Sequence, residues 1–220
     1  MIKLCIFDLD GTVLDTVRSI AHFGNTALKM NGIEPIETEE YKYLAGKGAA
    51  NLVRGMLNFK NCYTDALYQK VFRDYNAAYD ANVTYKTTVF DGLLEVLDSI
   101  KAQGIRIAIV SNKPDFATRT VVNAIYGENY FDFVTGQVPG VALKPDPTTV
   151  LSVMERFGAT REECLYIGDT SVDMQTGKNA GMYTVGVLWG FRGREELLEN
   201  GADILIEKPC ELYDCVVRAK

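Results

Sequence analysis

The sequence has few of the residues that most metal sites and nucleic-acid surfaces are built from. Histidine occurs once in 220 residues, and the five cysteines are too far apart in sequence to form a zinc site. Their odd number favours reduced thiols over a disulfide framework. Acidic residues outnumber basic ones by 29 to 23, and the net charge of -6 argues against nucleic acid as the main partner.

Long apolar runs are missing as well. No stretch approaches the length of a membrane-spanning helix, and the opening run reaches a carboxylate at Asp8, too early for a signal peptide. No low-complexity tract and no internal repeat interrupts the chain. We therefore expect a globular, cytoplasmic protein with no membrane partner. Its oligomeric state, monomer or dimer, is left open by the sequence.

The sequence does contain an alternation of strand and helix patterns. An apolar run over residues 4–9 predicts a buried first strand, and amphipathic helical spacing fills residues 16–82. From residue 83 onward, strand and helix signals alternate, which predicts an α/β fold: a Rossmann-like, doubly wound parallel sheet with helices on both faces. Residues 1–15 and 83–220 form the predicted core domain, and residues 16–82 form an inserted all-helical cap domain.

The individual elements follow from the same patterns. After the first strand, further strands are expected at residues 105–110, 131–135, 164–167, 184–188 and 203–206. In the second part of the chain, helices are expected at residues 93–102, 115–126, 147–157, 172–180, 195–199 and 212–217.

Polar side chains end three of the predicted strands, and a lysine stands in a loop stiffened by two prolines. They are Asp8 and Asp10 after the first strand, Ser111 and Asn112 after the second, Asp169 and Asp173 after the run at 164–167, and the loop residue Lys144. Ligands of an open parallel sheet bind beyond the carboxyl ends of its strands. These residues are therefore the first candidates for a functional site.

The carboxylates predict a divalent cation. Asp8 and Asp10 are two residues apart, which in extended backbone puts both on the same side of the strand. With Asp169 and Asp173 at the same sheet edge, four acids would repel one another unless a cation lay among them. Carboxylates are hard ligands and no histidine or cysteine accompanies them, so Mg²⁺ is expected, with these four aspartates as its candidate ligands.

Phosphoryl transfer is the reaction class that this set favours. It requires positioning, neutralisation of the phosphoryl oxygens and a nucleophile in line with the leaving group. Asp8 can attack as a carboxylate, and Asp10 can carry a proton. Ser111 can donate to a phosphoryl oxygen, and Lys144 supplies positive charge. These four residues are the predicted catalytic set.

Together, the motifs resemble those of haloacid dehalogenase-type phosphatases. The motifs are Asp8-Leu9-Asp10-Gly11-Thr12-Val13, Ser111-Asn112-Lys113, Lys144-Pro145 and Gly168-Asp169-x-x-x-Asp173. The resemblance implies that Asp8 becomes an aspartyl-phosphate, while Asp10 protonates the leaving alcohol and then deprotonates the hydrolytic water. It also implies Mg²⁺ held by Asp8, Asp169 and the backbone carbonyl of Asp10, with Asp173 ligating directly or through water. Gly11, Thr12 and Asn112 are the candidate substrate-binding residues of these motifs.

The helical insertion is similar to the cap that closes over the active site in this family. Residues 43–53 look like the substrate-facing loop and helix of phosphoglycolate phosphatases. Lys47, between two glycines, is the candidate to pair with a substrate carboxylate, and an ordinary exposed lysine in a flexible turn is the alternative. The predicted partner is a small phosphorylated metabolite, with phosphoglycolate as the first choice.

Other functions stay open at this point. A phosphosugar mutase resembling β-phosphoglucomutase would use the same aspartyl-phosphate, and a pyrophosphatase or 5'-nucleotidase would share the motifs. A receiver-like phospho-acceptor module would explain the acids but not Asp10 or the helical insertion. The carboxylates fix the reaction type, whereas substrate choice depends on cap geometry. The role of Trp189, which follows a predicted strand, is also open.

Overall fold

A parallel sheet forms the centre of the larger part of the molecule. The structure is a computed structural model that describes residues 1–218, so residues 219–220 of the predicted core domain lie outside the described residues. Within that range the strands are β1 (Leu4–Phe7), β2 (Arg106–Pro114), β3 (Phe133–Gln137), β4 (Cys164–Gly168), β5 (Tyr183–Val187) and β6 (Ile204–Ile206). Their order is β3-β2-β1-β4-β5-β6, and every pairing is parallel. The predicted α/β fold with a doubly wound parallel sheet is confirmed.

Helices cover both faces of this sheet. They are α5 (Leu93–Ala102), α6 (Asp115–Tyr126), α7 (Thr148–Arg156), η2 (Arg161–Glu163), α8 (Ser171–Ala180), α9 (Arg194–Glu199) and α10 (Glu211–Arg218). Side chains alternate along β1, so that Leu4 and Ile6 belong to one apolar cluster and Cys5 and Phe7 to the other. Burial on both faces explains why the strands read as continuous apolar runs.

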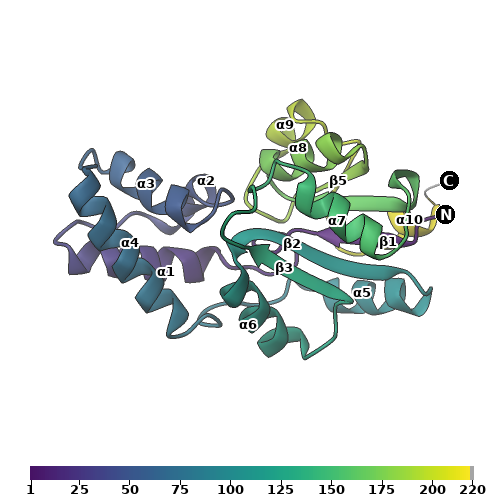
Figure 1. Ribbon diagram of the computed structural model, residues 1–220, viewed down its shortest axis with the longest axis horizontal. Coiled ribbons are helices and arrows are strands. Elements are labelled where there is room, and N and C mark those ends of the chain that lie inside the picture. The colour runs from purple at the N-terminus through teal and green to yellow at the C-terminus, as the bar shows by residue number, and fades with distance from the viewer. Residues whose placement is uncertain (219–220) are drawn as a thin grey trace.

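The predicted helical stretch packs as a separate layer at one end of the molecule, opposite the two chain termini (Figure 1). Its elements are α1 (Val17–Met30), η1 (Thr38–Glu40), α2 (Tyr41–Leu44), α3 (Ala49–Phe59) and α4 (Asp65–Asp80). Helices α1 and α3 both pack against α4. No helix in residues 1–218 is long and apolar enough to cross a membrane.

The two connections between the helical stretch and the sheet lie side by side. The N–H of Asp15 donates to the carbonyl of Thr88 at 2.8 Å, and the N–H of Thr88 donates back at 3.3 Å. This pair forms an isolated antiparallel bridge. The chain therefore leaves the sheet and returns to it at a single place.

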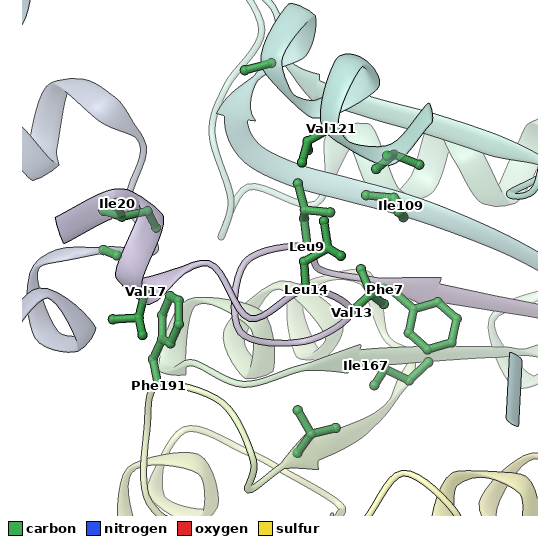
Figure 2. Close-up of a cluster of buried hydrophobic side chains, with 14 of the residues drawn as sticks. Phe7, Leu9, Val13, Leu14, Val17, Ile20, Ile109, Val121, Ile167 and Phe191 are labelled. Atoms are coloured by element: carbon green, nitrogen blue, oxygen red, sulfur yellow. The ribbon is translucent and has the colours of Figure 1, made fainter. Parts of the chain in front are cut away.

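The turn after β1 is anchored by apolar burial on the sheet. Leu9, Val13 and Leu14 are fully buried and lie among side chains of neighbouring elements, including Ile109 and Val121 (Figure 2). Each such side chain contributes about 1.5–3 kcal/mol when it leaves water. Burial of these residues fixes the intervening polar positions of the turn at the carboxyl end of the strand.

Candidate active site

Asp8 and Asp10 sit at the centre of the sheet edge. Asp8 follows β1 directly, is 5% exposed, and donates its N–H to the carbonyl of Ile167 in β4 at 2.9 Å. The carbonyl of Leu9 then accepts from the N–H groups of Val13 and Leu14 at 3.1 and 3.0 Å, which closes a tight turn. Asp10 lies within this turn, on the side of the helical stretch that contains α1 to α4, which we call the helical segment.

Gly11 allows a third aspartate to approach the turn closely. Its φ is +85°, a left-handed conformation that favours glycine, and a Cβ there would collide with the carboxylate of Asp169. Gly190, in the loop after β5, packs against Asp169 in the same way. Gly11 was predicted to contact substrate, and the structure places it against this carboxylate.

Three buried carboxylates meet at this point. Asp8, Asp169 and Asp173 each offer a ligand oxygen, and these oxygens lie within 4.8 Å of one another. Burial and the charge of Asp173 raise the pKa of Asp8, Lys144 opposes the rise, and the net pKa is about 7. Burial, with the charges of Asp173 and Asp8, also holds the pKa of Asp169 well above its usual range. A bound cation would relieve this crowding, and an all-oxygen set fits Mg²⁺.

Hydrogen bonds fix the orientation of Asp169 and Asp173. The hydroxyl of Thr12 donates to one oxygen of Asp169 at 2.7 Å, and the N–H of Phe191 donates to the other at 2.7 Å. Asp173 accepts from the backbone N–H of Thr170 at 3.0 Å, as part of a capping box at the start of α8, and also from the Thr170 hydroxyl at 2.6 Å. Thr12, predicted to bind substrate, therefore lies where it orients a candidate metal ligand.

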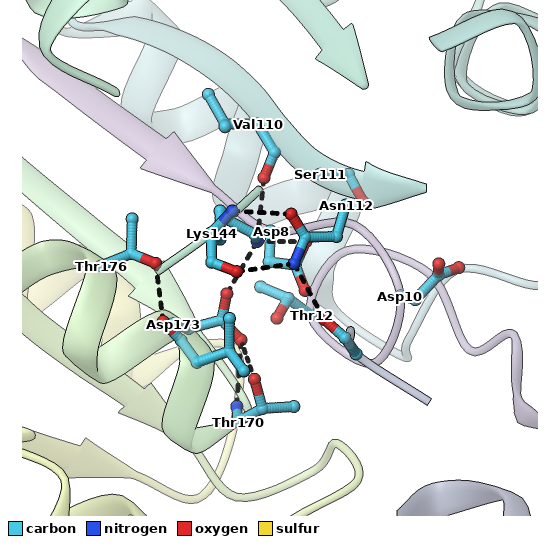
Figure 3. A network of polar contacts seen from close by, with 12 residues as sticks. Asp8, Asp10, Thr12, Val110, Ser111, Asn112, Lys144, Thr170, Asp173 and Thr176 are labelled. Carbon is cyan, nitrogen blue, oxygen red and sulfur yellow. Dashed lines mark hydrogen bonds and ion pairs between the residues drawn. The ribbon is translucent and has the colours of Figure 1, made fainter. Parts of the chain in front are cut away.

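Lys144 lies inside the carboxylate cluster. Its Nζ is 2.8 Å from oxygens of both Asp8 and Asp173 and donates to the carbonyl of Val110 at 3.1 Å (Figure 3). Burial disfavours its charge, but the Asp173 and Asp8 carboxylates outweigh burial and raise the pKa of Lys144. It is a fixed positive charge beside the predicted nucleophile.

Ser111 and Asn112 are both buried and lie within β2, which continues to Pro114, beyond the strand end predicted at residue 110. The side-chain oxygen of Asn112 accepts from the backbone N–H of Lys144 at 2.9 Å. Its side-chain nitrogen donates to the backbone carbonyls of Lys144 and Gly46 at 3.1 Å each. This side chain therefore ties the Lys144 loop to the loop before α3. Ser111 reaches the cavity beyond the sheet edge, where a hydroxyl can donate to an anion.

That cavity, of about 50 Å³, lies between the strand ends and the helical segment. The core contributes Asp8, Asp10, Ser111 and Lys113 to its walls, and the helical segment contributes Gly48, Tyr75, Tyr79 and Asp80 among others. Lys47 is exposed and does not line it, so its role in substrate binding stays a prediction.

Lys113 was not identified as a site residue from the sequence. It is buried, and its Nζ lies 2.9 Å from each carboxylate oxygen of Asp10. Burial opposes the charge, but Asp10 and neighbouring groups outweigh it and raise the pKa of Lys113. The available signal was the spacing: Lys113 is two residues beyond Ser111 on one strand, so both side chains emerge on the same side.

The loop after β5 carries two further residues that the sequence did not assign. Arg192 is 9% exposed and donates to the carbonyl of Ala45 in the helical segment at 3.2 Å, while it pairs with Glu196. Trp189 donates its ring N–H to the carbonyl of Thr12 at 3.0 Å, so this tryptophan makes a contact within the chain. Both residues brace the site from the side of β5.

Comparison with known proteins agrees with this geometry. Residues 5–187 match the family model of haloacid dehalogenase-like hydrolases. The chain belongs to this family. A phosphoglycolate phosphatase from Aquifex aeolicus is 30% identical over 210 residues, covering 96% of this chain and 94% of the relative. Another from Pseudomonas putida is 31% identical and covers 96% of this chain and 76% of its own length.

A solved structure is similar to this chain over nearly its whole length. A crystal structure of a protein from Lactobacillus delbrueckii subsp. bulgaricus superposes with a TM-score of 0.92 at 28% identity, covering 97% of this chain and 98% of that one. The predictions of an enzyme and of a haloacid dehalogenase hydrolase resembling phosphoglycolate phosphatases are confirmed. Membership of a hydrolase family argues against the receiver-like alternative.

Proposed function

We propose that this hydrolase is a Mg²⁺-dependent phosphatase that cleaves a small phosphate monoester through an aspartyl-phosphate on Asp8, with phosphoglycolate as its first-choice substrate. The observation that carries the proposal is the meeting of Asp8, Asp169 and Asp173 within 4.8 Å, beside the Lys144 ammonium group. A nucleophile, a cation site and a fixed positive charge are the main requirements of phosphoryl transfer.

Mg²⁺ would be held by Asp8, Asp169, Asp173 and the backbone carbonyl of Asp10. These are oxygen donors, and three of them are buried carboxylates whose mutual repulsion a divalent cation offsets. When bound, Mg²⁺ neutralises charge on the phosphoryl oxygens. Thr12 and Phe191 orient one of these carboxylates through the contacts described above.

In the first half-reaction, a carboxylate oxygen of Asp8 attacks phosphorus and forms the acyl-phosphate bond. The phosphorus–oxygen bond to the alcohol breaks, and Asp10 gives its proton to the leaving oxygen. Lys144 and the Ser111 hydroxyl stabilise the phosphoryl oxygens by charge and by hydrogen bonding.

In the second half-reaction, water attacks the same phosphorus. Asp10 takes a proton from that water, the bond from phosphorus to the Asp8 oxygen breaks, and inorganic phosphate leaves. Asp8 returns as a carboxylate and Asp10 as an acid. The helical segment, residues 16–82, would act as a cap that excludes bulk water over the core formed by residues 1–15 and 83–220.

Substrate choice rests on the relatives and on cavity size. Two relatives at 30% and 31% identity are phosphoglycolate phosphatases, and a cavity of about 50 Å³ favours a short ester over a bulky one. Pyrophosphate, 5'-nucleotides and sugar phosphates are the next substrates to compare.

The experiment is a panel of these esters, with released phosphate measured in Mg²⁺ and in EDTA. We expect phosphoglycolate to give the highest kcat/KM and EDTA to abolish the activity. Conversion of β-glucose 1-phosphate to glucose 6-phosphate without release of phosphate would instead identify a mutase. Full activity in EDTA would contradict the metal requirement.

A further inference from the structure

We propose that Lys113 binds a carboxylate at the non-phosphate end of the substrate, so that the enzyme selects short phosphate esters carrying a second anionic group. This inference rests on the proposed function, because it requires a phosphate monoester in the site. It assigns the recognition of that group to the core strand β2 rather than to Lys47.

The position of Lys113 supports this role. Its side chain is 6% exposed, and its Nζ contacts both oxygens of Asp10 at 2.9 Å. The same Nζ lies 4.8 Å from the centre of the Tyr79 ring in α4. Lys113 is therefore held where the turn after β1 meets the helical segment, on the wall of the cavity.

The charge distribution on the cavity wall supports it as well. Among the described residues that line this cavity, Lys113 carries the positive charge, while Asp8, Asp10 and Asp80 carry negative charge. Lys144 is engaged by two aspartates and does not line the cavity. A second negative charge on a bound substrate needs a cationic partner once it leaves water, and Lys113 is the residue placed to meet it.

A carboxylate on a bound phosphoglycolate would lie close enough to Lys113 to pair with it. If Asp10 contacts the ester oxygen, as the proposed mechanism requires, a glycolate carboxyl carbon lies only two bonds of roughly 1.5 Å beyond that oxygen. Lys113 Nζ is 2.9 Å from Asp10, so the carboxylate lies within its reach. An ammonium group has three N–H donors, so Lys113 can hold Asp10 and a substrate oxygen at the same time.

Neighbouring groups on the same wall complete an anion site. The hydroxyl of Tyr79, a residue that is 4% exposed, lies near the side chains of Lys113 and Ser19 but makes no hydrogen bond of normal geometry within residues 1–218. It is a buried donor that a substrate carboxylate would satisfy. Helix α3 begins at Ala49 with Gly48 as its uncapped N-terminal neighbour, and both line the cavity, so the positive end of the helix dipole also faces it.

The test is a double-mutant cycle in which one change is made in the enzyme and the other in the substrate. The substrates are 2-phosphoglycolate and 2-phosphoglycolamide, whose neutral amide has nearly the shape of the carboxylate. The enzymes are wild type, Lys113→Gln, and Lys47→Gln as the matched control from outside the cavity. We expect the wild type to prefer the carboxylate by roughly 10- to 100-fold in kcat/KM. We expect that preference to fall to within about 3-fold in Lys113→Gln and to persist in Lys47→Gln.

The ratio is measured on one preparation of each variant, so it does not depend on how much of that variant folds. Equal losses on both substrates in Lys113→Gln would show that the lysine acts only through Asp10, and would overturn the proposal. Loss of the preference in Lys47→Gln would overturn it too. Equal wild-type rates on both substrates would contradict carboxylate binding by the enzyme but would agree with the proposed phosphatase activity. Absence of phosphate release from every ester would contradict both proposals.

Tyr79→Phe gives a second, independent variant. It deletes only the hydroxyl, so the Lys113–Asp10 pair is kept. We expect the carboxylate preference to fall by roughly 2- to 10-fold, the range of one neutral hydrogen bond. An unchanged preference would contradict the place of Tyr79 in the anion site.

Discussion

The two walls of the cavity are built differently. On the sheet side, Asp8, Lys144 and Asp173 follow or flank parallel strands, and each is fixed by contacts at 2.8–3.1 Å from several elements. On the helical side, the Tyr79 hydroxyl makes no hydrogen bond of normal geometry within residues 1–218, and Lys47 is exposed. The groups of the proposed reaction are therefore held by the strand edge, whereas the proposed recognition of the substrate is divided between Lys113 on that edge and the less constrained helical wall.

Among substitutions on the sheet-side wall, removal of the proposed nucleophile should have the largest effect. Asp8→Asn should lower kcat with p-nitrophenyl phosphate in Mg²⁺ by at least about 10³-fold, because an amide cannot form the acyl-phosphate. Asp98→Asn, which affects an exposed hydrogen bond with Tyr130, is the matched control and should keep full activity. Retention of phosphate release by Asp8→Asn would end the covalent mechanism.

The crowding of acids on the sheet side should appear in the pH dependence of stability without metal. Asp8 has a pKa of about 7 in the folded protein against 3.8 ordinarily, so between these values the folded state binds a proton that the unfolded state lacks. Its contribution to the free energy of unfolding therefore falls as pH rises from about 4 to 7, by roughly 2–4 kcal/mol. Urea unfolding in EDTA measures this, and the difference between wild type and Asp8→Asn isolates the effect. A difference that does not change with pH would contradict it.

Metal addition should relieve the same crowding. At Mg²⁺ concentrations about 100 times its dissociation constant, the folded state should gain about 2.7 kcal/mol, seen as a higher Tm. Asp169→Asn removes one of the three buried carboxylates and should lose most of this gain. An equal rise in Tm for both proteins would place the bound metal elsewhere.

The link between the two walls can be weakened on its own. Arg192→Met removes the donor to the carbonyl of Ala45, so the loop before α3 is held less firmly and KM for phosphoglycolate should rise about 10-fold with a smaller change in kcat. Arg194→Met is the matched control, since this exposed arginine pairs with Glu207 away from the cavity. Equal effects of the two substitutions would argue against a bracing role for Arg192.

The same contrast explains how much the sequence could predict. Apolar runs and terminal polar residues located the strands and brought together Asp8, Asp169, Asp173 and Lys144, because parallel strands end at one edge. The role of Thr12 as an orienting group for Asp169 was not predicted, since it depends on a contact between residues 157 positions apart. Arg192 was missed for a related reason: its partners in the helical segment are backbone carbonyls, which leave no sequence pattern.

Lys113 could be recognised only in part from the sequence. Its spacing of two residues from Ser111 is visible in the sequence, but the predicted strand ended at residue 110 and its partner Asp10 lies 103 residues away. The ion pair becomes visible only once β1 and β2 are known to be neighbours. Sequence patterns therefore located the cluster of Asp8, Asp169, Asp173 and Lys144 well, and the contacts between the core and the helical segment poorly.

The bridge between Asp15 and Thr88 has a consequence for how such enzymes diversify. Since the outgoing and incoming segments are hydrogen-bonded to each other, the strand pairing of the sheet does not depend on the length of the chain between them. The intervening helices can be lengthened, shortened or exchanged by recombination while the strand pairing stays unchanged. The part of the specificity that lies in the helical segment can in this way change at a single insertion point, while Lys113 and the carboxylate cluster stay in place.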